Sequence, residues 1–326
     1  MAASASIPMA PPVAATGPIK SNDQMFAHST GFWDNYRRGR PQVPASFFER
    51  IYRYHRDHGG QFGTAHDVGA GVGPYAAELR TPFAHVIVSD IVATNVQQAE
   101  AHLGRDGFSY RAAPIEAADD LRPGSVDLVF ATNVMHFADQ PAAMAAIATQ
   151  LRPGGTFACA GFGPARFADP AVQAVWERIS QQGGRLLLGM ADRPQETVNV
   201  MARSSGPYNV APLDQRWFHP GALRLHLRMA PNDGGGITGL LPPERAHEVS
   251  DPDFTGPADV VVEETTEDWR FETDWEGFLH HFRSFPHASV DPAAFTELLQ
   301  EMQGLLAQGR SLQGCWPATL ILATRR

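Results

Sequence analysis

The loop Asp67-Val68-Gly69-Ala70-Gly71-Val72-Gly73 follows an apolar run and precedes a helical pattern, so its residue types could bind a ligand. Glycine permits positive φ angles and a close approach to the backbone, and the first turn of a helix presents N–H groups without intrahelical partners. A dinucleotide fingerprint needs a third glycine three positions after its second, where this chain has Pro74. The spacing therefore disfavours a pyrophosphate, and a glycine-rich surface turn is the alternative.

Asp90 ends the next β-branched run, residues 85–89, and could be the acidic partner of this loop. A carboxylate at this strand end can accept hydrogen bonds from both hydroxyl groups of a ribose. The alternatives are a solvated aspartate and the N-cap of the following helix. The loop and Asp90 together favour a ligand that contains a ribose.

These features resemble the class I S-adenosylmethionine-dependent methyltransferases, whose first motif is acid-x-Gly-x-Gly-x-Gly. The four fixed places of that motif and the family's ribose-binding acid are occupied by Asp67, Gly69, Gly71, Gly73 and Asp90. Residues 125–130 are similar to the family's fourth strand, and residues 151–155 to its LxPGG turn. The resemblance extends from about Phe32 to the final strand and implies S-adenosyl-L-methionine as the cofactor.

Within that superfamily, two segments are similar to the trans-aconitate methyltransferase group and its fungal small-molecule relatives. They are residues 33–37 with Arg40-Pro41, and residues 133–137. Residues 113–116 depart from the relatives, because Pro114 has no side-chain acceptor for the adenine amino group; Glu116 or the backbone of Ile115 must supply it. The cofactor-binding residues that the resemblance implies are Trp33, Tyr36, Arg40, Asp67, Gly69, Ala70, Gly71, Gly73, Asp90, Ile91, Ile115, Glu116 and Asn133.

Strand and helix patterns alternate around the glycine loop at a spacing that predicts a parallel sheet with helices on both faces. Strands are expected at 64–68, 85–89, 108–112, 126–131, 156–161, 259–264 and 318–324. Helices are expected at 45–58, 74–79, 95–103, 141–151, 170–182, 275–285 and 292–308. With right-handed crossovers, the predicted fold is α/β, a Rossmann-like doubly wound, mostly parallel sheet of the seven-stranded methyltransferase type with an inserted cap.

Changes in composition divide the chain into four parts. Residues 1–24, rich in Ala, Pro and Ser, are expected to form a disordered tail. Residues 25–182 are expected to hold an N-terminal lid and the cofactor-binding core. Residues 183–256 are dense in Gly and Pro without a strand–helix rhythm, which favours an inserted substrate cap. Residues 257–326 are expected to complete the α/β core.

The segment 25–40 is aromatic and basic but too short for a core element. Trp33 and Tyr36 are therefore expected to cover the cofactor, with plain packing as the alternative. Arg37, Arg38 and Arg40 could hold carboxylates of cofactor or substrate, or could be surface arginines.

Methyl transfer from a sulfonium is an in-line displacement, so the protein must mainly align the reacting atoms away from water. A carboxylate nucleophile needs a cationic clamp and no base, whereas a hydroxyl or ammonium must lose a proton to a general base. His136 follows the fourth predicted strand, at the sheet edge where open α/β folds bind ligands, and is the candidate catalytic base. A helix cap or a hydrogen bond to the cofactor is the alternative role.

The composition excludes other classes of partner. The 326 residues contain 26 basic and 35 acidic side chains and one lysine, Lys20, which disfavours nucleic acid. No apolar run approaches the roughly 18 residues of a membrane span, and the first 20 residues lack the pattern of a secretory signal. Cys159 and Cys315 fit a reducing compartment. We expect a cytoplasmic protein without a membrane association.

No metal site is predicted, because the adjacent His280 and His281 would point about 100° apart on a helix and lack ligands at suitable spacing. The predicted function is S-adenosylmethionine-dependent methylation of a small organic molecule of secondary metabolism, on a carboxylate or hydroxyl oxygen. The alternatives are a cofactor-binding relative without methyl transfer, such as a cyclase or regulator, and a nucleotide-dependent oxidoreductase, against which Pro74 argues. The sequence specifies no oligomeric state.

Overall fold

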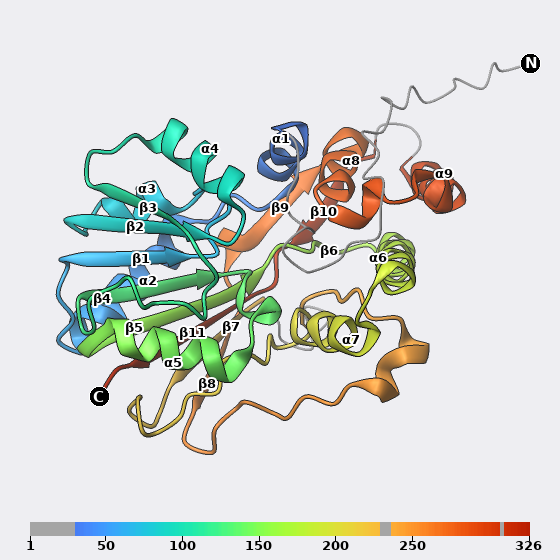
Figure 1. The fold of residues 1–326 in the computed structure, drawn as a ribbon. Coiled ribbons are helices and arrows are strands. Elements are labelled where there is room, and N and C mark those ends of the chain that lie inside the picture. Colours follow the sequence, from blue (N-terminus) through green and yellow to red (C-terminus); the bar gives the residue numbers. More distant parts are fainter. Residues whose placement is uncertain (1–29, 229–235, 307–309) are drawn as a thin grey trace, which may run out of the picture.

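A mixed sheet of eight strands runs through the molecule in the order β3-β2-β1-β4-β5-β11-β7-β8 (Figure 1). The computed structural model describes residues 30–228, 236–306 and 310–326, so the predicted tail at 1–24 lies outside the described residues. The strands are β1 (Thr64–Val68), β2 (His85–Asp90), β3 (Phe108–Ala112), β4 (Val126–Thr132), β5 (Leu151–Phe162), β7 (Leu223–Leu227), β8 (Val260–Glu264) and β11 (Ala318–Thr324).

The first five strands of the sheet are parallel, as predicted: β1 pairs with β2 and β4, β2 with β3, and β4 with β5. β11 is antiparallel to both β5 and β7. β8, predicted at 259–264, pairs in parallel with β7 at the edge, and β7 is the strand added to the seven that were predicted. The doubly wound α/β prediction is therefore confirmed.

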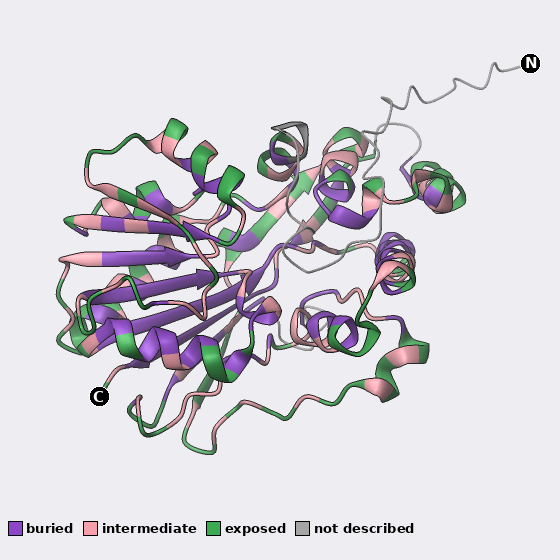
Figure 2. Cartoon of the chain, viewed as in Figure 1, coloured by how far each residue is buried: buried purple, intermediate pink, exposed green. Residues whose placement is uncertain are grey.

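The alternation of side chains along β4 shows why this sheet is covered on both faces. Leu128 and Phe130 pack in the hydrophobic cluster that includes α2 (Ala45–Asp57), and Val129 and Ala131 pack in the cluster that includes α5 (Gln140–Gln150). All seven residues of β4 are buried, and Figure 2 shows the central strands buried along most of their length. A strand buried on both faces has a continuous apolar sequence rather than an alternating one.

The segment predicted as an inserted cap contributes to the sheet. β7 lies within residues 183–256, and its Leu225 and Leu227 belong to the same cluster as Phe130. Helix α6 (Pro170–Met190) also continues across the boundary expected at residue 182. The Gly and Pro density around β7 masked a short alternating strand that is stabilised by pairing with the distant β11. Helix α6 continues because Gly183 and Gly184 are buried packing positions inside it and do not end the helix.

A second layer lies beyond the carboxyl ends of the parallel strands (Figure 1). It contains α1 (Thr30–Gly39), α6, α7 (Pro194–Arg203), α8 (Trp275–Arg283), α9 (Thr296–Leu305) and a small antiparallel sheet of β6 (Arg166–Phe167), β10 (Leu312–Cys315) and β9 (Arg270–Thr273). Residues of α6, α8 and α9 share a hydrophobic cluster. Part of the region predicted to complete the core, residues 257–326, therefore belongs to this layer.

The segment expected to be too short for a core element forms helix α1, in which Trp33 and Gly39 are buried. His281 of α8 joins this helix to the rest of the molecule. Its Nδ1 lies 2.7 Å from the carbonyl oxygen of Gly39, and the Ala165 N–H donates to its Nε2 at 3.1 Å. Both ring nitrogens are thus used in structural hydrogen bonds. The described ranges contain no group of three His, Cys, Asp or Glu residues that could hold a metal.

Candidate functional site

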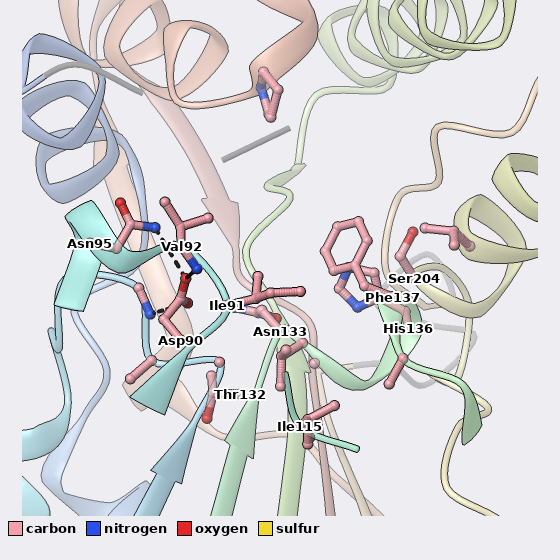
Figure 3. A pocket seen from close by; sticks show the side chains of 18 of the residues that line it. Asp90, Ile91, Val92, Asn95, Ile115, Thr132, Asn133, His136, Phe137 and Ser204 are labelled. Atoms are coloured by element: carbon pink, nitrogen blue, oxygen red, sulfur yellow. Dashed lines mark hydrogen bonds between the residues drawn. The ribbon is translucent and has the colours of Figure 1, made fainter. Parts of the chain in front are cut away.

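A cavity of about 410 Å³ opens where the parallel strands meet the second layer (Figure 3). Its walls contain His136 and every residue predicted to bind the cofactor except Gly73. In Figure 3, Asp90 and Asn95 lie on one side of the cavity, and His136, Phe137 and Ser204 lie on the other. Residues of α4 (Ala93–Leu103) and of the short η2 (Met135–Phe137) line it as well, whereas α3 (Ala76–Arg80) begins just after the lining residues Pro74 and Tyr75.

The glycine loop contacts its neighbours closely. Gly71 has a φ of +58°, and a Cβ there would lie 3.1 Å from the Trp33 ring. A Cβ on Gly69 would overlap Val134. Gly73 is different, because a Cβ at this position would lie 2.9 Å from Cδ1 of Leu103 and Gly73 does not line the cavity. Gly73 is therefore a packing position.

Asp90 is buried at the carboxyl end of β2 and accepts hydrogen bonds from two directions (Figure 3). The Gly71 N–H donates to Oδ2 at 2.8 Å, and the Val92 N–H donates to Oδ1 at 2.9 Å. Asn95, which the sequence analysis did not identify, donates to Oδ1 at 3.3 Å. Burial raises the pKa of Asp90, and these hydrogen bonds oppose that rise. Oδ1 thus receives two donors, whereas Oδ2 receives one and retains a lone pair for a further donor.

Asp67 lies on β1 beside Asp90 and is 2% exposed. Its Oδ2 has no hydrogen-bond partner among the described residues. Burial, together with the charge of Asp90, raises the pKa of Asp67 well above its usual range. A buried carboxylate oxygen without a partner is costly, so this one fits a site whose ligand brings a donor or a positive charge.

The other side of the loop offers apolar surface for a flat ring. Ile91 follows Asp90 and is 46% exposed at the cavity, which is unusual for a large aliphatic side chain. Ile115 and Glu116 also line the cavity, and Glu116 accepts a hydrogen bond from the Asp139 N–H at 2.9 Å. Glu116 thus already holds the start of α5 and keeps one oxygen for another donor.

Asn133 follows β4 in a left-handed conformation, with a φ of 55°. Its side-chain Oδ1 accepts from the Phe162 N–H at 2.9 Å, which ties β4 to β5 at the cavity. The preceding Thr132 is 8% exposed, and its hydroxyl has no partner among the described residues. Strained backbone of this kind is concentrated at functional sites.

His136 lies on η2 and is 8% exposed. Its Nδ1 lies 3.1 Å from the hydroxyl of Tyr208, a residue that the sequence analysis did not identify. Burial lowers the pKa of His136 to about 3, and the positive charges of Arg203 and Arg40 act in the same direction. The imidazole is therefore neutral at physiological pH.

Arg40 is the arginine of the predicted clamp that reaches the cavity. It donates to the Ser284 hydroxyl at 3.0 Å, and its guanidinium lies 4.0 Å from the Phe285 ring centre. No carboxylate pairs with the Arg40 guanidinium in the described part of the chain, so it can form an ion pair with a carboxylate of a ligand. Arg37 and Arg38 are exposed outside the cavity, and Arg37 pairs with Asp34. The structure therefore does not bring the three arginines together.

The second layer supplies apolar side chains to the cavity wall, and the sequence analysis assigned none of them to the site. They come from α6, α7 and the loops near 240 and 285, and are those of Leu187, Val200, Met201, Leu240, Phe285 and Pro286. They carry no motif, so only the fold brings them to the cofactor loop.

The class of protein follows from the sheet order, the glycine loop with Asp67, and Asp90 at the end of the second strand. These define a class I S-adenosylmethionine-dependent methyltransferase. The residues fit that cofactor, because Asp67 keeps an unpartnered oxygen, Arg40 lacks a carboxylate partner in the described ranges, and Ile91 is exposed beside them.

Comparison with known proteins gives the same family. Residues 66–159 match the family described as methyltransferase domain. The chain is 76% identical to methyltransferase tpcM of Aspergillus fumigatus, over all of both chains. It is 59% identical to methyltransferase gedG of Aspergillus terreus, over 94% of this chain and 95% of that protein. A solved structure from Anaeromyxobacter dehalogenans, described as a type II methyltransferase, shares the fold at a TM-score of 0.54 and 22% identity, covering 87% of this chain and 97% of the other.

The chain belongs to the S-adenosylmethionine-dependent methyltransferases, with fungal relatives along its whole length. This membership favours an enzyme over the alternatives of a non-transferring relative and an oxidoreductase. No helix in the described ranges could span a membrane.

Proposed function

We propose that this methyltransferase methylates a carboxylate oxygen of a small, largely apolar organic acid. When bound, S-adenosylmethionine supplies an electrophilic methyl group on a positively charged sulfur. The residues that would hold it are those of the glycine loop with Asp67 and Asp90, Ile91 and Ile115 at the adenosine end, and Arg40 at its carboxylate. The predicted lid and cap would enclose the acceptor opposite the loop.

The apolar wall supports an acceptor with a hydrophobic body. Met201, Leu187 and Phe285 face the same cavity as the cofactor loop, from helices of the second layer and the loop after α8. Apolar walls with a few placed polar groups are typical of small-molecule sites. The polar groups that line the same cavity include the hydroxyl of Thr132, the amide of Asn133 and the imidazole of His136.

The observation that supports a carboxylate acceptor is that His136 is buried and neutral. An imidazole with a pKa of about 3 is a weak base for a phenol or alcohol. Tyr208, its neighbour, has a pKa that burial raises well above its usual range, so it is not an anion that could accept the proton. A carboxylate is already ionised and needs no base. A hydroxyl acceptor would need a base, and the following test distinguishes the two kinds of acceptor.

The test uses two matched acceptors: an aromatic carboxylic acid that also bears a phenol, and the same compound with the carboxyl as a primary amide. Each is incubated with the protein and S-adenosylmethionine, and S-adenosylhomocysteine is measured. We expect turnover with the acid and none with the amide, because the amide keeps the phenol but lacks the carboxylate. Equal turnover of both compounds would reject carboxylate methylation in favour of the hydroxyl.

A further inference from the structure

Tyr208 occupies the cavity in a backbone conformation that aromatic residues rarely adopt. Its φ is 56° and its side chain is 1% exposed. The ring packs on Gly161 at the end of β5, where any Cβ would overlap it. A bulky residue with a positive φ is an outlier that must be held by its surroundings, and such residues are concentrated at functional sites. This geometry raises the question of what the Tyr208 hydroxyl does.

The phenol oxygen of Tyr208 makes a hydrogen bond with His136 Nδ1, at 3.1 Å. The backbone N–H groups of Met135 and His136 also act on this oxygen, because they oppose the rise in the pKa of Tyr208 that burial causes. An N–H that lowers the pKa of a phenol has its positive end toward the oxygen, so these two groups face the lone pairs. The hydroxyl proton of Tyr208 is then directed to the remaining partner, Nδ1 of His136.

A neutral imidazole carries one proton, so a ring whose Nδ1 accepts a hydrogen bond must carry that proton on Nε2. The groups facing this ring favour the neutral form. Arg203 of α7 donates to the His136 carbonyl oxygen at 3.2 Å and contributes positive charge, and Arg40, which follows α1, contributes positive charge as well. Tyr208 supplies the remaining polar contact. The ring is neutral, with its N–H on Nε2.

His136 lines the cavity, and its Nε2 makes no hydrogen bond with any described residue. We propose that Tyr208 is a positioning residue that holds His136 in the Nε2-protonated tautomer, so that His136 donates a hydrogen bond to the acceptor instead of removing a proton from it. This inference rests on the proposed function for its acceptor, a carboxylate whose second oxygen would receive the Nε2–H.

The reaction then balances without a base. One carboxylate oxygen forms a bond to the methyl carbon while the carbon–sulfur bond breaks, and the electron pair of that bond remains on sulfur. The charge of the carboxylate and that of the sulfonium disappear together. No proton moves, so an N–H donor at His136 can align the acceptor throughout.

The direct test is ¹⁵N NMR of the histidine side chains in the full-length protein. His136 is assigned by comparison with His136→Gln, and the couplings of its ring nitrogens identify which one carries the proton. We expect the Nε2–H tautomer in the wild type and a mixture of tautomers in Tyr208→Phe. A wild-type ring protonated on Nδ1, or on both nitrogens at neutral pH, would overturn the proposal. This measurement needs no acceptor, so it is independent of whether the proposed function is right.

Kinetics with an identified acceptor give the second test. Glutamine keeps an N–H donor near the Nε2 position but cannot act as a base, whereas alanine removes the donor. We expect His136→Gln to keep turnover within about 10-fold of the wild type and His136→Ala to lose about 10²-fold, the scale of a misaligned acceptor. Equal large losses in both variants would show that a base is required and contradict the proposal.

Tyr208→Phe should reduce turnover in the wild-type background but have little further effect in the His136→Gln background, because Tyr208 acts through the imidazole. Tyr110→Phe is the matched control: it removes a hydroxyl that bonds to the Gly104 carbonyl oxygen, away from the cavity. Additive losses from Tyr208→Phe in both backgrounds would indicate a structural role alone and reject the positioning role.

Discussion

The backbone N–H of Gly71 donates a hydrogen bond of 2.8 Å to the carboxylate of Asp90, so the glycine loop and the second strand form one unit. The opposite oxygen of Asp90 receives the Val92 N–H, which leaves the carboxylate fixed at the cavity wall. A change in the loop is therefore expected to move the acid that faces the cofactor as well as the loop itself.

Gly71→Ala should abolish most binding of S-adenosylmethionine. The backbone has a φ of +58°, which disfavours alanine, and the new Cβ would lie 3.1 Å from the Trp33 ring. We expect affinity to fall by at least about 10-fold, measured by isothermal titration calorimetry. Gly104→Ala is the control, since Gly104 also has a positive φ but open space around it. Equal affinities in the two variants would reject the role of Gly71.

Asp67→Asn should stabilise the ligand-free protein and weaken cofactor binding. The substitution removes a carboxyl group whose ionisation is disfavoured by burial and by the charge of Asp90, and we expect a gain on the order of 1 kcal/mol in the free energy of unfolding at neutral pH. Because the folded-state pKa of Asp67 is raised, its carboxylate destabilises the wild type at high pH and is neutralised as the pH falls through that pKa. The advantage of the variant should therefore shrink in acid.

Urea unfolding at pH 7 and pH 5 measures this effect, and calorimetry measures the loss of affinity. A variant that is less stable at pH 7, with the cofactor still bound at wild-type affinity, would show that Asp67 is a structural carboxylate.

Arg40→Met should lower the affinity for S-adenosylmethionine by about 10-fold or more, since a charged hydrogen bond to the carboxylate of the cofactor is lost. Methionine retains the apolar stem between the rings of Tyr36 and Phe285. The control is Arg37→Met, the same chemical change at an exposed position. Unchanged cofactor affinity together with a raised KM for the acceptor would assign Arg40 to the acceptor instead.

The buried histidines should make the protein acid-sensitive. Burial lowers the pKa of His281 to about 3, so between that value and about 6.5 the unfolded chain binds a proton that the folded chain excludes. The contribution of the neutral histidine to the free energy of unfolding is therefore fully present above about pH 6.5. It falls as the pH is lowered, and one such group loses about 2 kcal/mol at pH 5.

His281→Gln should therefore be less stable than the wild type at pH 7 but lose about 2 kcal/mol less between pH 7 and pH 5. Denaturant unfolding at the two pH values measures the difference, with the exposed His58→Gln as control. A pH-dependent loss equal to that of the wild type would show that His281 is not excluded from protonation in the folded state.

The sequence predicted the part of the site that local motifs encode. The glycine loop and Asp90 depend on residues within one strand–loop–helix–strand unit, so their types and spacing were enough to place them at the cavity. Gly73 was the exception, because the same motif position serves packing against Leu103 and lies outside the cavity wall.

The remaining part depends on contacts between distant segments. Tyr208 reaches His136 because a strained loop folds back across Gly161, and no pattern around position 208 indicates this. Met201 likewise reaches the cavity only because α7 packs against α6 and η2. Helix α1 has few aliphatic residues and is held by α8 through His281, so its own sequence indicated aromatic packing but no core element.

The measurement that tests the central claim most directly is the chemistry of the methylated product. The protein is incubated with methyl-labelled S-adenosylmethionine and a metabolite extract, and the labelled product is then treated with mild alkali. A methyl ester releases labelled methanol under these conditions, whereas an aryl or alkyl ether retains its label. We expect the label to be released as methanol. A labelled product that is stable to alkali would contradict carboxylate methylation.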